Sequence, residues 1–311
     1  MVNKVSTSIN TIYNDLKSSF KLASGNILSY FLANLGMLIA VAVLLGLVLI
    51  PIGIAAVLII GLEASAWEAI GAGMAAWAQG NPLAAGGLAA LFIIPLVAFF
   101  FTAVASIYGM SKDLITHGET KAERAFSWLR GKFLTFFGAG ALLTVIIVLP
   151  PAALYYAASV LMGYSVPVAV STVLSVITFV WVFITVGLCA MVFPAITHGK
   201  GVQEAFKESF DLARTRFERV YGLLSGVIAM FAVSFGPVIV WGLTLAPLVP
   251  PGSPTMFLNP ITAAVMVWTV FVALLWLLIL LPAVIIAFTK VYAELTGKPI
   301  ATQQPPPLPL I

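Results

Sequence analysis

The chain has 311 residues, of which 61% are hydrophobic and only 8% are charged, and its formal net charge at pH 7 is +4. A water-soluble fold has about a quarter of its residues charged, so the composition excludes an ordinary soluble globular protein. The single cysteine, Cys189, excludes disulfides within the chain and argues against a metal cluster built on thiolates. The composition predicts an all-α integral membrane protein.

Long segments without Asp, Glu, Lys or Arg dominate the chain, and these are residues 22–62, 69–111, 133–199 and 220–289. About twenty apolar residues cross the roughly 30 Å hydrocarbon core of a bilayer. The first two segments can each supply one span, and the last two are long enough for a hairpin of two. The sequence therefore predicts six spans, at 27–50, 85–110, 133–158, 168–193, 220–246 and 261–288.

The basic residues all fall on one side of this arrangement. The fifteen Lys and Arg residues lie in segments 1–21, 112–132, 200–219 and 290–311. The opposite side carries Glu63 and Glu68 and no basic residue. Because basic loops are retained in the cytoplasm, we expect a multi-pass protein of the plasma membrane with both termini inside. The positive charge then reflects topology, and we expect no nucleic-acid partner.

Residues 51–84 do not fit the six-span pattern simply. A second apolar stretch follows Pro51, and a Gly/Ala-rich stretch containing Trp67 and Trp77 comes after it. Tryptophans are enriched at membrane–water interfaces, so an outer re-entrant or surface helix is the favoured interpretation. An arrangement of eight spans also keeps every basic residue inside and stays open.

Three segments of equal length precede the odd-numbered spans, at 16–27, 122–133 and 206–217. Aligned without gaps, they share apolar residues at a spacing of 4, 3 and 4, which forms one stripe on a helix. The stripes are Leu16, Phe20, Ala23, Ile27; Ala122, Phe126, Leu129, Phe133; and Phe206, Phe210, Ala213, Phe217.

This pattern predicts three internal repeats, each a cytoplasmic interfacial amphipathic helix followed by a transmembrane hairpin. The repeats cover 1–110, 111–196 and 197–290, a Pro-rich cytoplasmic tail covers 291–311, and all belong to one membrane domain.

Residues that carry chemistry are scarce in the apolar segments. No Asp, Glu, Lys, Arg or His lies within the six predicted spans, and such residues normally mark proton relays and ion paths. No Walker loop, HExxH motif or nucleophile elbow is present. We therefore expect no enzymatic activity, no catalytic residue, no cofactor and no metal. Sodium sites built from backbone carbonyls at broken helices stay open.

Two small groups of polar residues are candidates for a ligand site. His117 and His198 both occur in Thr-His-Gly, just after an even-numbered span. Two histidines are too few for a metal site, which needs three or four ligands, so solvated interface residues are the favoured interpretation. Ser171, Ser175 and Thr178 share one face of the fourth span. They either line a polar path or, as we favour, pack against a neighbouring helix.

Basic residues recur in equivalent columns of the second and third aligned segments, as Arg130 and Lys132 and as Arg214 and Arg216. They stand where an interfacial helix turns into a span. Binding of lipid phosphates and general positive-inside anchoring both explain this position. The candidate partners are membrane lipids, especially anionic ones.

The stretch VFPAITHGKGVQEAFKESFDLARTRFERVYGLLSGVIA (192–229) ends one span, passes through a short basic linker and opens the next. The telling elements are Phe193-Pro194, Ala205-Phe206, Ser209-Phe210, Leu212, Phe217, Arg219 and Gly222. In these elements it resembles a large group of prokaryotic membrane proteins. That group includes the membrane domain attached to some glycerophosphodiester phosphodiesterases, and stand-alone relatives of unknown function. The resemblance implies a helical hairpin bundle and brings no catalytic residues.

Together these features favour a non-enzymatic membrane protein that acts at the lipid interface, with transporter-like handling of a lipid or amphiphilic substrate. The alternative is a scaffold or accessory subunit whose cytoplasmic amphipathic helices dock a protein partner or a second copy of the chain.

Overall fold

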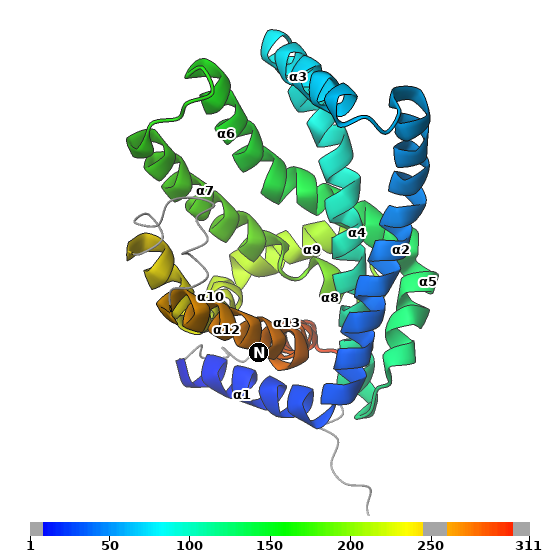
Figure 1. Ribbon diagram of the computed structural model, residues 1–311. Helices are drawn as coiled ribbons and strands as arrows, with labels where there is room; N and C mark the ends of the chain where they lie inside the picture. Colours follow the sequence, from blue (N-terminus) through cyan, green and yellow to red (C-terminus); the bar gives the residue numbers. More distant parts are fainter. Residues whose placement is uncertain (1–8, 245–259, 301–311) are drawn as a thin grey trace, which may run out of the picture. The chain divides into compact units, whose positions relative to one another are not determined.

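The computed structural model describes residues 9–244 and 260–300, and all regular structure in these residues is helical (Figure 1). The elements are α1 (Ile9–Gly25), α2 (Ile27–Ile60), α3 (Ala64–Gly80), α4 (Pro82–His117), α5 (Ala122–Leu143), the π-helix η1 (Thr144–Val148), α6 (Leu149–Leu161), α7 (Val168–Cys189), α8 (Val192–Thr197), α9 (Val202–Thr215), α10 (Phe217–Thr244), α12 (Pro260–Leu275), the π-helix η3 (Trp276–Leu280) and α13 (Leu281–Thr296).

Six helical stretches in the described residues are long and apolar enough to cross a membrane. They are Ile27–Ile60, Pro82–His117, Ala122–Leu161, Val168–Thr197, Phe217–Gly242 and Pro260–Thr296. The expectations of an all-α protein and of six apolar helices that can span a bilayer are therefore confirmed.

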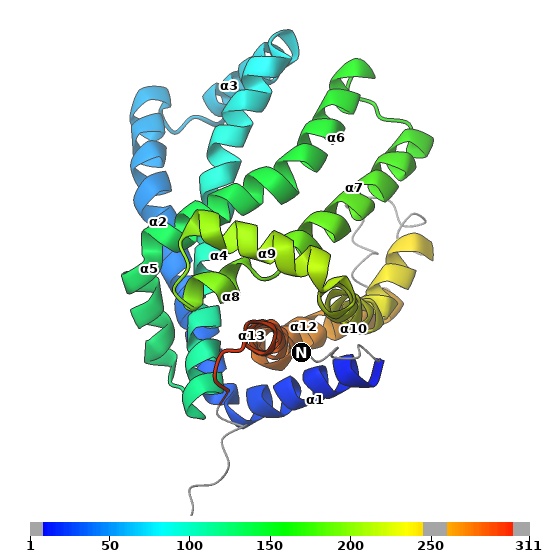
Figure 2. The same ribbon diagram turned by 180° about the vertical axis from the view of Figure 1, so that it is seen from behind.

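Contacts divide the chain into two compact units, each built from segments that are distant in sequence. The first unit contains the described residues up to Asn34, Ile107–Ala125 and those from Phe210 onward, and the second contains Leu35–Ser106 and Phe126–Ser209. In the first unit α1 packs along α13 and also contacts α10 (Figure 2). In the second unit η1 continues directly into α6, and both contact α7; α6 and α7 lie side by side in Figure 1.

Several predicted boundaries differ from the structure. α2 continues through Pro51 to Ile60, so the apolar stretch after Pro51 extends the first span instead of starting a re-entrant segment. At 1.5 Å per residue its 34 residues reach about 50 Å, well beyond the hydrocarbon core. The Trp67 side chain of α3 donates a hydrogen bond to the Gly61 carbonyl at 2.9 Å and closes the turn between α2 and α3.

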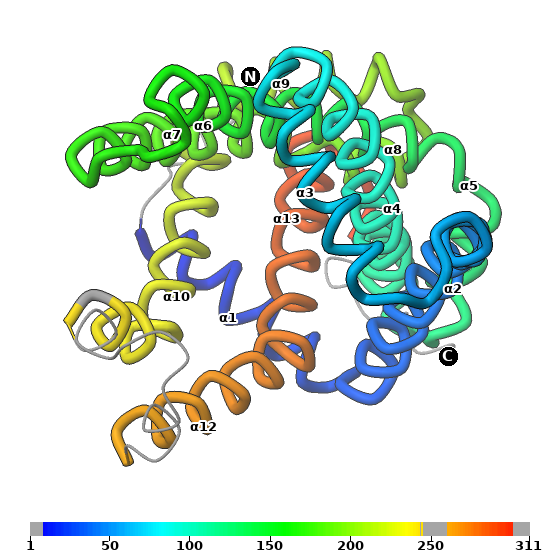
Figure 3. Tube along the Cα trace, turned by 45° about the horizontal axis from the view of Figure 1, so that its top comes forward, coloured from blue at the N-terminus to red at the C-terminus, as the bar shows by residue number. Residues whose placement is uncertain are grey.

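The last apolar helix also runs further than expected. The chain continues from α12 through η3 into α13 without a loop, up to Thr296 (Figure 3). The predicted Pro-rich tail 291–311 therefore begins inside α13, and residues 301–311 lie outside the described part. Lys290 and Glu294 become part of the helix that carries the sixth span.

The π-helix η3 is explained by the proline that follows it. The Leu281 amide donates to the Trp276 carbonyl across the widened turn. Pro282 has no N–H group, so the next carbonyl, that of Leu277, loses its backbone donor. The Asn34 side chain of α2 donates to this carbonyl at 2.8 Å. A buried side chain thus satisfies the group that proline leaves free.

The same arrangement occurs at η1 in the second unit. Pro150 and Pro151 follow η1 and supply no N–H groups to its carbonyls. The Trp181 indole of α7 donates to the Ile146 carbonyl at 3.0 Å. At η1 and η3, prolines therefore accompany a widened helical turn. In each, a carbonyl left free by a proline accepts a hydrogen bond from a side chain of a neighbouring helix.

The three aligned segments bend at the same column. α1 ends and α2 begins around Asn26, and α9 ends and α10 begins around Arg216. In the middle segment Lys132 has non-helical dihedrals, φ −126° and ψ 18°, inside α5. Burial follows the columns as well, because Ser19, Ala125 and Ser209 occupy one column and all three are buried.

We predict that the two serines of this column contribute differently to stability. Ser209 donates to the Leu188 carbonyl at 2.6 Å and accepts from the Met191 amide at 3.1 Å, where α7 ends and α8 begins. The buried Ser19 hydroxyl has no hydrogen-bond partner within residues 9–244 and 260–300. Ser209→Ala should cost about 1–3 kcal/mol. Ser19→Ala should be neutral or slightly stabilising, and equal thermal shifts in detergent for both variants would contradict this.

Candidate functional site: a buried charge network

A charge network formed by Asp15, Arg219, Lys290 and Glu294 lies on the buried face of α1 in the first unit. Two glycines of α10, Gly222 and Gly226, allow α1 to approach closely. A Cβ atom at Gly222 would lie 2.6 Å from the Ile12 side chain, and one at Gly226 would lie 3.2 Å from the Leu16 side chain. Small residues four positions apart are the usual means by which membrane helices pack closely. This packing sets the distance between α1 and α10.

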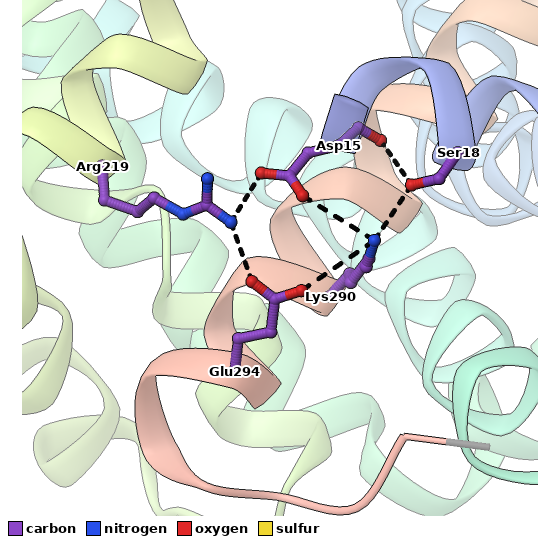
Figure 4. A network of polar contacts seen from close by, with 5 residues as sticks. All are labelled: Asp15, Ser18, Arg219, Lys290 and Glu294. Atoms are coloured by element: carbon purple, nitrogen blue, oxygen red, sulfur yellow. Dashed lines mark hydrogen bonds and ion pairs between the residues drawn. The ribbon is translucent and has the colours of Figure 1, made fainter. Parts of the chain in front are cut away.

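Four charged side chains from three helices meet in the first unit, as Figure 4 shows. Nη2 of Arg219, in α10, lies 2.6 Å from Oδ2 of Asp15, in α1, and 2.8 Å from Oε2 of Glu294, in α13. Nζ of Lys290 lies 3.7 Å from Oδ1 of Asp15 and 3.9 Å from Oε1 of Glu294. Lys290 also donates to the Ser18 hydroxyl at 3.0 Å.

The charges alternate, so each cation faces both carboxylates and the network is neutral as a whole. The side chains of Arg219 and Asp15 are only 5% and 7% exposed, whereas those of Lys290 and Glu294 are 20% and 27% exposed. Burial raises the pKa of the Asp15 carboxyl above its ordinary value, while Arg219 and Lys290 act in the opposite direction. Nη1 of Arg219 is buried without a hydrogen-bond partner in the described part of the chain.

This arrangement is suited to holding helices together. Every charge already faces an opposite charge, and the one hydroxyl present, that of Ser18, donates to the Asp15 carbonyl at 3.0 Å. Buried ion pairs contribute little net stability, but removing one partner leaves an uncompensated charge and is costly. The network therefore fixes the rotation of α1 about its own axis against α10 and α13.

The predicted basic residues lie at the bends described above. Arg130 and Arg214 are exposed, and Lys132 and Arg216 are half-buried at the bends themselves. Half-burial suits long side chains whose aliphatic parts pack while the charge reaches water or phosphate. Arg130 and Lys132 belong to the second unit, whereas Arg214 and Arg216 belong to the first.

The two histidines have the same local geometry in different units. Nδ1 of His117 lies 3.2 Å from the Asp113 carbonyl, and Nδ1 of His198 lies 2.8 Å from the Pro194 carbonyl, four residues earlier in each case. Within the described residues, no group of three or more His, Cys, Asp or Glu side chains is placed to hold a metal ion.

The hydroxyls of α7 are used mainly in packing. The Ser175 hydroxyl hydrogen-bonds to the Tyr155 hydroxyl of α6 at 2.8 Å, and the Ser171 hydroxyl donates to the Val168 carbonyl at 2.9 Å. The Thr178 hydroxyl is buried with no hydrogen-bond partner in the described part of the chain. Of these three hydroxyls, only that of Ser175 joins α7 to α6.

Two sequence features are related to the charge network. Asp15, Ser19 and Ala23 are spaced four apart and form the buried face of α1, which is small and polar. Lys290 and Glu294 are also four apart and follow an apolar span directly. Neither feature identifies the network by itself, because the partner helices are distant in sequence.

The fold and the network define an all-α multi-pass membrane protein in which a helix outside the six apolar helices is fixed to two of them by buried charges. No family model, no curated protein and no solved structure matches the chain.

Proposed function

We propose that the chain is a non-enzymatic protein of the plasma membrane that acts at the lipid interface and handles a lipid or an amphiphilic substrate. The observation that carries this proposal is the common bend of the three aligned segments. Each changes direction where a partly polar helix becomes an apolar span, and Lys132 and Arg216 stand at two of the bends. Such a position lets a basic side chain reach the phosphate layer beside its own span.

The internal repeats are supported by the way the helices outside the apolar stretches pack. α1 packs along α13, and Ser209 of α9 bonds to the end of α7. We infer that α1 packs against the sixth span in the same way that α9 packs against the fourth span.

The scaffold alternative is favoured by one observation on α9. Its exposed residues are Gln203, Glu204, Lys207, Asp211 and Arg214, along with Thr215. Mixed charges of this kind suit water or a polar protein surface better than a lipid interface. A partner that crosslinks to this face in cells, with no phospholipid retained by the purified protein, would favour the scaffold.

The orientation of the protein follows from the basic residues and can be tested by labelling. In a Cys189→Ala background, Ala75→Cys and Tyr164→Cys should react with a membrane-impermeant maleimide from outside intact cells. Glu119→Cys and Gly201→Cys should react only after the cells are opened, because their segments carry the basic residues. Labelling of position 201 from outside would overturn the proposed topology and the cytoplasmic termini.

The function proposal predicts that phospholipid stays bound through purification and depends on the basic residues at the bends. Native mass spectrometry of the wild type should detect bound anionic lipid. Replacing Arg130, Lys132, Arg214 and Arg216 with Gln removes four charges, each contributing about 1 kcal/mol near an anionic surface. We expect most of the anionic lipid to be lost while insertion is kept. Equal occupancy in both proteins would make these residues topology signals only.

A further inference from the structure

The face of α1 opposite the charge network carries a strip of exposed apolar side chains. Ile9, Tyr13 and Phe20 lie within a narrow strip of the helix surface. Tyr13 is 61% exposed and Phe20 is 43% exposed. Because the network and the glycines of α10 fix the rotation of α1, this strip faces outward.

Two lysines lie along one edge of the apolar strip. Lys17 and Lys21 are both exposed, stand one helical turn apart, and form no ion pair with a described residue. Nζ of Lys17 lies 5.9 Å from the centre of the Tyr13 ring. Asp15 is the one acidic residue of α1, and it is buried and paired on the other face. Because no acidic residue of α1 lies near the two lysines on this face, they give it a net charge of +2. Like charges one turn apart repel each other.

The equivalent helix α9 provides an internal comparison. Lys207 occupies the same column as Lys17, but Glu204, Glu208 and Asp211 lie within one turn of it. Lys200 pairs with Glu208 at 3.3 Å. Both helices follow nearly the same burial pattern along their columns, although Phe20 is exposed and Phe210 is half-buried. Unlike α9, α1 combines an exposed apolar strip with lysines whose charge no nearby acidic residue balances.

We infer that α1 holds the most tightly bound anionic phospholipid, with Ile9, Tyr13 and Phe20 inserted below the phosphates and Lys17 and Lys21 bound to the headgroup, while the basic residues at the bends hold further lipids. This inference rests on the proposed function and names its lipid class and its contact site. The aromatic and aliphatic strip distinguishes a lipid from free phosphate, because only the lipid offers an apolar layer. Tyrosine suits this depth, since its ring is apolar and its hydroxyl is polar.

The test compares lysine variants of the full-length protein. Delipidated protein in detergent is titrated with phosphatidylglycerol and with phosphatidylcholine, and native mass spectrometry gives the dissociation constant of the first bound lipid. Lys17→Gln/Lys21→Gln should weaken phosphatidylglycerol binding roughly 30-fold, since each lysine contributes about a factor of five. Phosphatidylcholine binding should change little. Lys17→Arg/Lys21→Arg should keep the preference, and inorganic phosphate should not compete.

The matched control is Lys200→Gln/Lys207→Gln, which removes two lysines from the α9 region and should change binding less than twofold. Thermal unfolding in the same detergent checks that every variant is folded. If the wild type prefers phosphatidylglycerol but the α1 variant binds it equally well, the inference for α1 is wrong and the proposed function stands. If the wild type binds neither lipid, the proposed function itself fails.

Discussion

Replacing Arg219 with Gln should produce the largest loss of stability of any single change in the first unit. The substitution leaves the carboxylates of Asp15 and Glu294 buried or half-buried next to each other, with Lys290 as their remaining cation. Removing one partner of a buried ion pair typically costs about 3–5 kcal/mol. Thermal unfolding in detergent, followed by circular dichroism, should therefore show a much lower midpoint than the wild type.

Two variants make this result specific to the network. Arg214→Gln removes an exposed arginine near the same helix boundary and should change the free energy of unfolding by less than about 0.5 kcal/mol. The double variant Asp15→Asn/Arg219→Gln removes one charge of each sign. Its destabilisation should be clearly smaller than the sum of the two single changes, because the two sites share one interaction. Additive effects would show that the ion pair does not hold α1.

In the second unit, Gly140→Ala should destabilise the packing of α5 against α4. A Cβ atom at Gly140 would lie 2.9 Å from Cβ of Phe101 and 3.0 Å from the Ala98 carbonyl oxygen. Neither atom is the end of a flexible side chain, so backbone must shift, at a cost of about 1–3 kcal/mol. Thermal unfolding in detergent measures this loss.

Gly138 is the matched control for Gly140. It lies two residues earlier in the same helix, and a Cβ atom there meets nothing within 4 Å. Gly138→Ala should be neutral or stabilising by up to about 1 kcal/mol, because alanine favours helix over glycine. If both substitutions had the same effect, close approach of α4 would not explain the glycine at position 140.

The sequence by itself determined the class of this protein, because hydrophobicity and charge act locally. A bilayer accepts only long apolar helices, and segments such as 133–199 leave no other solution. The common bend at Asn26, Lys132 and Arg216 could also be predicted from the sequence, since each stands in the same column of the aligned segments. Helix ends were predicted less well. α2 passes through Pro51 and α13 continues to Thr296, because neither a proline nor a charge by itself ends a helix.

Only the tertiary structure decided how the charges and the free carbonyls are used. Asp15 and Glu294 are far apart in sequence, and nothing local indicates that both face Arg219. Likewise, no pattern around Asn34 predicts its bond to the Leu277 carbonyl, which exists because Pro282 removes a donor on another helix. The packing of α1 on Gly222 and Gly226 brings Asp15 to Arg219. Pairings of this kind depend on which helices are neighbours, which helix propensity and periodicity do not encode.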